Sequence, residues 1–180
     1  MSRVAAAILA GGGARRVGSD KALAAIGGVP MIDVIAARLA VEVDTILICG
    51  RSHGAFPWVA DRPATGLGPL GGLAAALHWA SGRGFDRVLS VPCDTPHLPA
   101  DLLWRLSMGD DNVYADDCPV IGLWDTAGAA VLDALLAAPG RHAMRDFIDA
   151  VGARPFALGR IANVNTPGDL ARITAARNTG

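Results

Sequence analysis

The stretch Leu9-Ala10-Gly11-Gly12-Gly13-Ala14-Arg15-Arg16-Val17-Gly18-Ser19-Asp20-Lys21 decides the fold. It follows a short apolar run over residues 4–9, which predicts a buried strand. A strand that ends in a glycine-rich loop presents backbone N–H groups to phosphate, because glycine adopts positive φ and lets a ligand approach the main chain closely. The sequence therefore predicts a phosphate-binding loop at one edge of an α/β sheet.

The loop also holds three cations, Arg15, Arg16 and Lys21. Lys21 is the only lysine in the chain, although lysine and arginine together number 16. A sequence that uses arginine everywhere else and keeps one ammonium here indicates a site that needs a compact point charge. The alternative interpretation is a glycine-rich turn with solvated arginines.

Two better-known phosphate loops do not match this stretch. A Walker A loop has lysine and then Ser or Thr directly after its last glycine, whereas Gly18 is followed by Ser19 and Asp20. A dinucleotide-binding loop has the spacing G-x-G-x-x-G before a helix and an acidic residue about 20 residues later. Neither pattern is met.

The rest of the chain alternates apolar strand-like runs with helical periodicity, which predicts a mostly parallel sheet covered on both faces. Its 180 residues suit one α/β domain, so residues 1–180 are assigned to a single domain without a boundary. Strands are expected at residues 45–49, 58–60, 87–91, 113–115 and 120–124. Helices are expected around residues 32–39, 70–77, 102–106, 132–136 and 144–151.

Composition limits the class of partner. Hydrophobic residues make up 52% of the chain and charged residues 18%, with a net charge of -1. This balance argues against nucleic acid or an anionic membrane surface as the main partner, since both require a clustered basic face. The first ten residues have neither the length of a membrane span nor a cleavage site, so we expect a cytoplasmic protein that binds a small ligand.

Two acidic residues follow predicted strands, at the edge where open parallel sheets bind ligands. Asp94 lies in Pro92-Cys93-Asp94-Thr95-Pro96, and Asp61 opens a loop that ends in Gly68-Pro69-Leu70. Mg²⁺ prefers one or two protein carboxylates together with water and phosphate oxygens, which makes Asp94 and Asp61 candidate metal ligands. An Asp before Thr-Pro can equally be a turn or helix cap.

The quoted stretch resembles the L-A-G-G-x-x-x-R-x-G-x-D-K signature of the molybdenum cofactor guanylyltransferases. Three later segments resemble the same family in the same order: an Asp before G-P-L, the run P-C-D-T-P, and Asn163-Val164-Asn165-Thr166-Pro167. The resemblance implies a Rossmann-like three-layer fold and an Mg²⁺-dependent transfer of GMP from GTP to molybdopterin or the molybdenum cofactor, with release of pyrophosphate. Molybdoenzyme apoproteins or other cofactor-synthesis proteins would be further partners.

The resemblance also implies roles for particular residues. Arg16, Lys21 and Asp94 would be catalytic, Asp94 and Asp61 would bind the metal, and Asn163 and Asn165 would bind the acceptor. The nucleotide would contact Leu9, Ala10, Gly11, Gly12, Lys21, Asp61, Gly68, Pro69, Leu70 and Asp94. Because the acceptor's phosphate oxygen is already anionic, transfer needs positioning and charge neutralisation rather than a general base.

Two departures from the family and three alternatives bear on this interpretation. Cys49-Gly50 stands where the family often has an asparagine, and Cys118-Pro119 replaces a more polar pair. One alternative is a cytidylyltransferase for the same pterin, which resembles L-A-A-G at the loop with Asn in place of Asp20. The others are a non-catalytic nucleotide-binding adaptor and a domain for another phosphate ligand.

Overall fold

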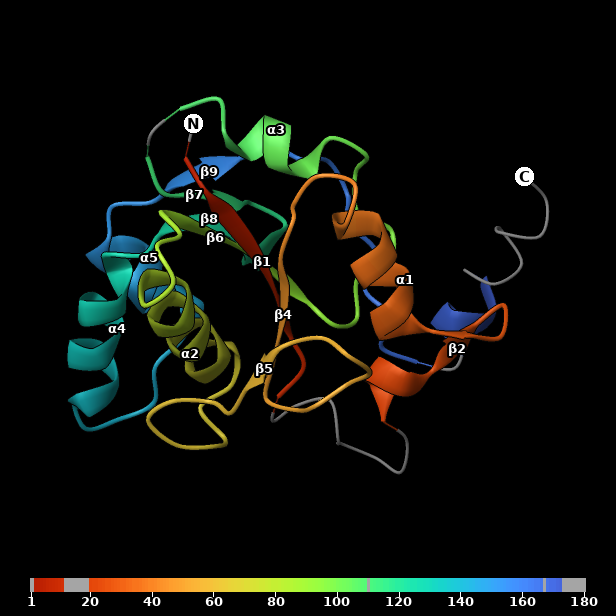
Figure 1. The fold of residues 1–180 in the computed structure, drawn as a ribbon, viewed down its shortest axis with the longest axis horizontal. Helices are drawn as coiled ribbons and strands as arrows, with labels where there is room; N and C mark the ends of the chain where they lie inside the picture. Colours follow the sequence, from red (N-terminus) through yellow and green to blue (C-terminus); the bar gives the residue numbers. More distant parts are fainter. Residues whose placement is uncertain (1, 12–19, 110, 167, 173–180) are drawn as a thin grey trace.

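The computed structural model describes residues 2–11, 20–109, 111–166 and 168–172. Its centre is a seven-stranded sheet in the order β5-β4-β1-β6-β8-β7-β9, which lies between two layers of helices (Figure 1). β1 (Val4–Leu9) is in the middle of the parallel half, between β4 (Ile46–Cys49) and β6 (Arg87–Pro92). The short β5 (Trp58–Val59) extends this half by pairing in parallel with β4.

The other half of the sheet contains the one antiparallel strand of the order given above. β8 (Cys118–Asp125) pairs antiparallel with β6 on one side and with β7 (Val113–Ala115) on the other. β9 (Arg154–Phe156) then pairs in parallel with β7. The predicted mostly parallel α/β sheet is therefore confirmed.

Each face of the sheet is covered because its strands are apolar on both sides. Along β1, Ala6 and Ile8 pack toward one helix layer, whereas Ala7 and Leu9 pack toward the other. The first layer consists of α1 (Met31–Leu39) and α3 (Leu102–Leu106). The second consists of α2 (Pro69–Ser81), α4 (Gly128–Ala137) and α5 (Met144–Ala150). Among the described helices, none is long and apolar enough to cross a membrane.

Some elements were not predicted from the sequence. β9 is one, because the run Arg154-Pro155-Phe156 has no apolar alternation and depends on its pairing with β7. The small hairpin of β2 (Ala25–Ile26) and β3 (Val29–Pro30) is another. β8 also begins two residues before the expected strand at 120–124.

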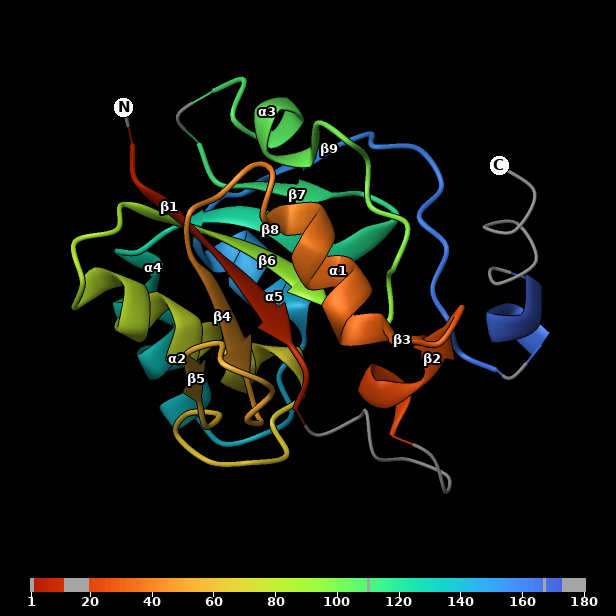
Figure 2. The ribbon, with the colours of Figure 1, turned by 45° about the vertical axis from the view of Figure 1, so that its right-hand side comes forward.

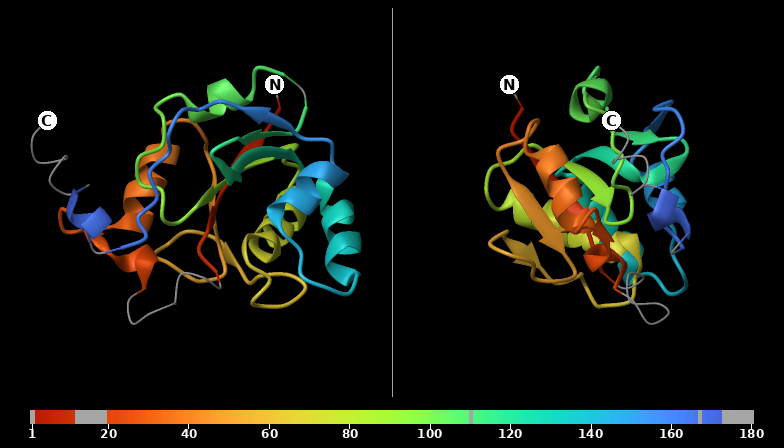
Figure 3. Two further views of the ribbon diagram at one scale, coloured as in Figure 1. Left: turned by 180° about the vertical axis from the view of Figure 1, so that it is seen from behind. Right: turned by 90° about the vertical axis from the view of Figure 1, so that its right-hand side faces the viewer.

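The strand directions place several chain segments at one edge of the sheet. β1, β4 and β6 are parallel and end at the same edge (Figure 2). Residues 157–166 return from β9 past α1 toward this edge (Figure 3). The loops that follow these strands therefore meet at one place.

Candidate functional site

The glycine-rich loop begins where β1 ends. The Ala10 amide donates to the carbonyl of Cys49 at 2.9 Å, which continues the β1–β4 pairing by one residue. Leu9, Ala10 and Gly11 thus lie at the carboxyl edge as predicted. Gly12 and Arg16 lie outside the described residues, and of Lys21 only the main chain is described, at the start of the 3-10 turn η2 (Lys21–Leu23).

Two glycines let the main chains of β1 and β4 touch at this edge. Gly50 has φ +88°, and a Cβ there would lie 2.4 Å from the Gly11 Cα. A Cβ on Gly11 would lie 2.6 Å from Asp61 Oδ2. Neither position can hold a side chain without displacing its neighbours, so the Cys49-Gly50 departure has a structural reason at its second residue.

Asp61 is buried beside this contact, with 8% of its surface exposed. Its Oδ1 atom is buried and accepts no hydrogen bond from the residues that the structure describes. Gly71 and Gly72 approach it from α2, since a Cβ on Gly72 would lie 3.6 Å from Oδ1. Burial raises the pKa of the Asp61 carboxyl above its usual value. Asp61 therefore presents a desolvated acceptor next to the glycine loop.

The predicted nucleotide segment Gly68-Pro69-Leu70 forms the start of α2. Gly68 is the N-cap residue with φ +63°, and Pro69 occupies the first helical position, where its missing N–H costs no hydrogen bond. The Arg62 amide donates to the Gly71 carbonyl at 3.0 Å and joins the Asp61 loop to this helix. The amino end of α2, which carries a partial positive charge, thus lies beside Asp61 and Gly11.

Asp94 follows β6 and lies in a tight turn. The Cys93 amide donates to the Leu9 carbonyl at 3.2 Å, and the Thr95 hydroxyl donates to the Pro92 carbonyl at 3.1 Å. Thr95 is fully buried, whereas Asp94 is half-buried. The turn therefore holds Asp94 directly beside the end of β1.

The Asn163-Val164-Asn165 segment is attached to this turn. The Val164 amide donates to the Asp94 carbonyl at 2.8 Å. Val164 is 4% exposed and packs in the core, while Asn163 and Asn165 on either side of it are exposed. The structure thus places Asp94 next to the segment that carries both predicted acceptor residues, whereas Asp61 has different neighbours, at the loop and α2.

The predicted helix start at Thr166 is also present. The Asp169 amide donates to Thr166 Oγ1 at 3.1 Å, and Asp169 Oδ2 accepts the Thr166 amide at 2.9 Å. These bonds, first of all the one with the Thr166 side chain, lower the pKa of Asp169 to about 2. The same carboxylate accepts the Asn165 amide at 3.1 Å and so holds the acceptor segment in place.

One polar pair at this edge was missed from the sequence. Arg51 lies two residues after β4, and its Nη1 donates to Asp20 Oδ2. His53 on the same loop lies with Nε2 2.7 Å from Asp33 Oδ1 of α1. The rule that ligands bind beyond the carboxyl ends of strands would have drawn attention to Arg51.

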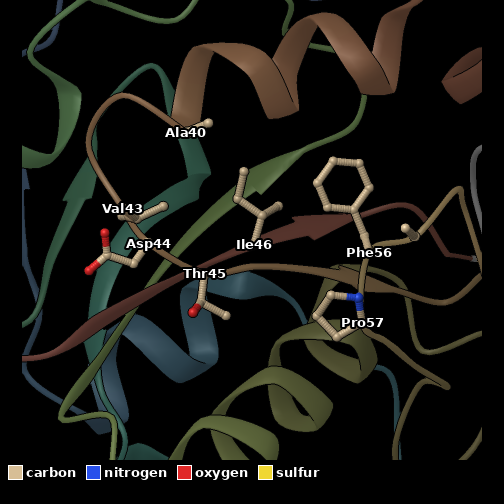
Figure 4. Close-up of a pocket in the computed structure, with 8 residues that line it drawn as sticks. Ala40, Val43, Asp44, Thr45, Ile46, Phe56 and Pro57 are labelled. Carbon is tan, nitrogen blue, oxygen red and sulfur yellow. The ribbon is translucent and has the colours of Figure 1, made fainter.

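A recess of about 570 Å³ lies elsewhere, at the amino end of β4 (Figure 4). It is lined by Ala40, Val43, Asp44, Thr45, Ile46, Ala55, Phe56 and Pro57. None of these residues belongs to the predicted site, which lies at the opposite end of the strand.

The fold is an α/β sheet whose carboxyl edge carries a glycine loop, the amino end of α2 and two carboxylates, which is the class of site that suits a phosphate-bearing ligand. A family model described as the MobA-like NTP transferase domain matches residues 6–155. The molybdenum cofactor guanylyltransferase of Rhodobacter capsulatus is 41% identical, over 94% of each chain, and that of Acidiphilium cryptum is 32% identical over 98% and 96%. The chain belongs to the MobA-like NTP transferase family, among relatives named molybdenum cofactor guanylyltransferase.

Solved structures agree on the fold. Molybdopterin-guanine dinucleotide biosynthesis protein A from Archaeoglobus fulgidus superposes with a TM-score of 0.78 over 98% of this chain and 100% of that one, at 18% identity. A 2-C-methyl-D-erythritol 4-phosphate cytidylyltransferase from Thermus thermophilus gives 0.71 over 99% and 100%, at 14% identity. At these identities the likeness concerns the fold alone.

Proposed function

We propose that this protein transfers GMP from GTP to molybdopterin or the molybdenum cofactor and releases pyrophosphate. The observation that supports it best is the hydrogen bond from Val164 to Asp94, which joins the predicted acceptor segment to the turn beside the glycine loop. Two substrates must meet in a group transfer, and here the segments predicted for each substrate lie on adjoining backbone. The names of the two relatives, both molybdenum cofactor guanylyltransferase, support the same reaction.

In this reaction a phosphate oxygen of the acceptor forms a bond to the α-phosphorus of GTP, and the bond from that phosphorus to the bridging oxygen breaks. The electron pair leaves with pyrophosphate, so no side chain has to remove a proton. The protein therefore contributes position and charge. The Gly11 main chain and the amino end of α2 face the nucleotide, and Asn163 and Asn165 contact the acceptor.

The described residues can hold Mg²⁺ through Asp94. They contain no group of three or more His, Cys, Asp and Glu side chains suited to a metal, and Mg²⁺ commonly uses one or two carboxylates and keeps several waters. Asp94 is half-buried at a strand end, which leaves room for those waters, whereas four glycines enclose Asp61. We therefore assign the ion to Asp94 and the nucleotide contact to Asp61. Bound Mg²⁺ would neutralise phosphate charge.

The test is turnover with molybdopterin and either GTP or CTP, measured as pyrophosphate release and as the dinucleotide product. We expect product with GTP and Mg²⁺. Product with CTP alone would refute the guanine assignment and favour the cytidylyltransferase. Binding of GTP without turnover would favour the adaptor, and failure of GTP with Mg²⁺ to raise the thermal midpoint would favour another phosphate ligand.

A further inference from the structure

The ion pair between Arg51 and Asp20 joins two segments of the site that are far apart in sequence. Arg51 follows β4, and Asp20 immediately precedes the turn η2 that begins at Lys21. The side chains are 15% and 28% exposed, respectively. The pair thus lies largely inside the protein at the carboxyl edge.

The pair is poorly explained by stability alone. Arg51 Nε and Asp20 Oδ1 are both buried, and neither has a hydrogen-bond partner among the described residues. Desolvation of two charges commonly offsets their attraction, and orphaned polar atoms add to the cost. A function for the pair would account for its presence.

The pair also lies close to the turn that holds Asp94. Burial raises the pKa of the Cys93 thiol to about 12, and Asp94, Asp20 and Arg51 all act on it through their charges. Cys93 is the residue before Asp94, and its amide donates a hydrogen bond to the Leu9 carbonyl at the end of β1. The guanidinium and the Asp20 carboxylate therefore lie in the same neighbourhood as the glycine loop and Asp94.

Of the two partners, Arg51 is on the better fixed segment. The preceding Gly50 packs against Gly11, and its amide donates to the Val59 carbonyl at 2.8 Å. His53, two residues further on, is held by Asp33 of α1. Asp20, by contrast, immediately precedes the three-residue turn η2, and its carbonyl accepts the Leu23 amide at 3.0 Å.

We propose that Arg51 is a positioning residue of the nucleotide site, which holds Asp20 and thereby sets the main chain at Lys21. It also neutralises the Asp20 carboxylate, which would otherwise repel a triphosphate bound at the neighbouring loop. This inference rests on the proposed function for its ligand. It adds to that function a residue outside the motifs seen in the sequence.

The neutralising role is tested by steady-state kinetics with GTP on the full chain. In Arg51→Gln the carboxylate of Asp20 remains uncompensated, so we expect KM for GTP to rise about tenfold, equal to ~1.4 kcal/mol, with a smaller change in kcat. Asp20→Asn added to Arg51→Gln removes the repelling charge and should return KM to within about threefold of wild type. Arg51→Lys, which keeps the charge, should be intermediate.

The matched control is Arg145→Gln, which breaks an exposed pair with Asp149 on α5. It removes the same charge from an exposed pair outside the segments that form the site and should leave KM unchanged. An unchanged KM in Arg51→Gln, or a double variant no better than the single one, would overturn the neutralising role.

The positioning role is tested without any nucleotide. Hydrogen exchange at the Leu23 amide reports the turn that Asp20 opens, and we expect faster exchange in Arg51→Gln than in wild type or Arg145→Gln. Equal exchange in all three would overturn the positioning role. This measurement needs no GTP, so it tests the positioning role even if the proposed function is wrong. A wrong proposed function would show itself differently, because wild type would then neither bind nor use GTP.

Discussion

At the scale of single residues, the two carboxylates of the site differ in what surrounds them. Asp61 is buried among glycines, and its Oδ1 has no hydrogen-bond partner among the residues that the structure describes. Asp94 is half-buried, and its carbonyl accepts a hydrogen bond from the acceptor segment. Similar residues placed at two strand ends therefore suit different tasks. This difference can be tested by replacing each carboxylate with its isosteric amide.

Asp61→Asn should stabilise the protein and weaken nucleotide binding. Because burial raises the pKa of Asp61, the fold disfavours the charged form, and the resulting loss of stability is present at neutral pH and is relieved as pH falls through the folded-state pKa. We expect a higher thermal midpoint than wild type at pH 7, and a gap that narrows on acidification. GTP affinity should fall about 10- to 100-fold, as for loss of a charged hydrogen bond. A lower midpoint at pH 7, or unchanged affinity, would contradict these roles.

Asp94→Asn should abolish transfer and leave the fold intact. The amide keeps the size of the side chain but not the charge that Mg²⁺ needs, so we expect product formation to fall by about 10³-fold or more. Asp117→Asn, an exposed carboxylate in the loop before β8, is the control. Product formation is measured as pyrophosphate release, and activity that is insensitive to both Asp94→Asn and a chelator would remove the metal from the proposal.

At the scale of elements, a stack of two aromatic rings between two guanidinium groups joins the layer of α2 to the sheet. The Arg3 guanidinium lies 4.6 Å from the Phe85 ring centre, Phe85 stacks on Trp79 at 5.9 Å, and the Arg83 guanidinium lies 4.3 Å over Trp79. Arg3 immediately precedes β1, Trp79 lies in the last turn of α2, and Arg83 and Phe85 lie in the loop between α2 and β6. The stack is at the edge of the sheet opposite the site.

Phe85→Ala should therefore lower stability without changing the reaction. It removes a half-buried ring and one cation–π contact, for which we expect a loss of about 1–3 kcal/mol in the free energy of unfolding. Chemical denaturation measures this loss, and the KM values for both substrates should remain those of wild type. A stable variant with altered KM would mean that this end of α2 communicates with the site.

Gly50→Ala tests the contact between the ends of β1 and β4. The new Cβ would meet the Gly11 main chain at 2.4 Å and would also require a left-handed backbone conformation at φ +88°. Gly159→Ala is matched in conformation, at φ +80°, but has nothing within 4 Å, so it costs only about 1 kcal/mol. We expect Gly50→Ala to cost clearly more and to weaken GTP binding, and equal effects of the two variants would show that the close approach is unimportant.

At the scale of the whole molecule, sequence reasoning succeeded where a local pattern decides the structure. The apolar runs predicted β1, β4 and β6, and the rule for strand ends placed Asp61 and Asp94 at one edge. β9 and the Arg51–Asp20 pair escaped prediction for the same reason. Each depends on contacts between segments more than 30 residues apart, and neither Arg154-Pro155-Phe156 nor Arg51 has a local signature.

The segment that contains Val164 lies about 70 residues after Asp94 in the sequence and is hydrogen-bonded to it, so the last prediction concerns this long-range contact. Val164→Pro removes the amide that donates to Asp94, and Val164→Ala keeps that amide while losing a similar part of the buried side chain. We expect Val164→Pro to raise KM for molybdopterin about tenfold, as for a lost hydrogen bond with local rearrangement, while the stabilisation by GTP remains. Val164→Ala should change KM little. If both variants raised KM equally, packing of Val164 rather than its bond to the Asp94 turn would join the acceptor segment to the reaction.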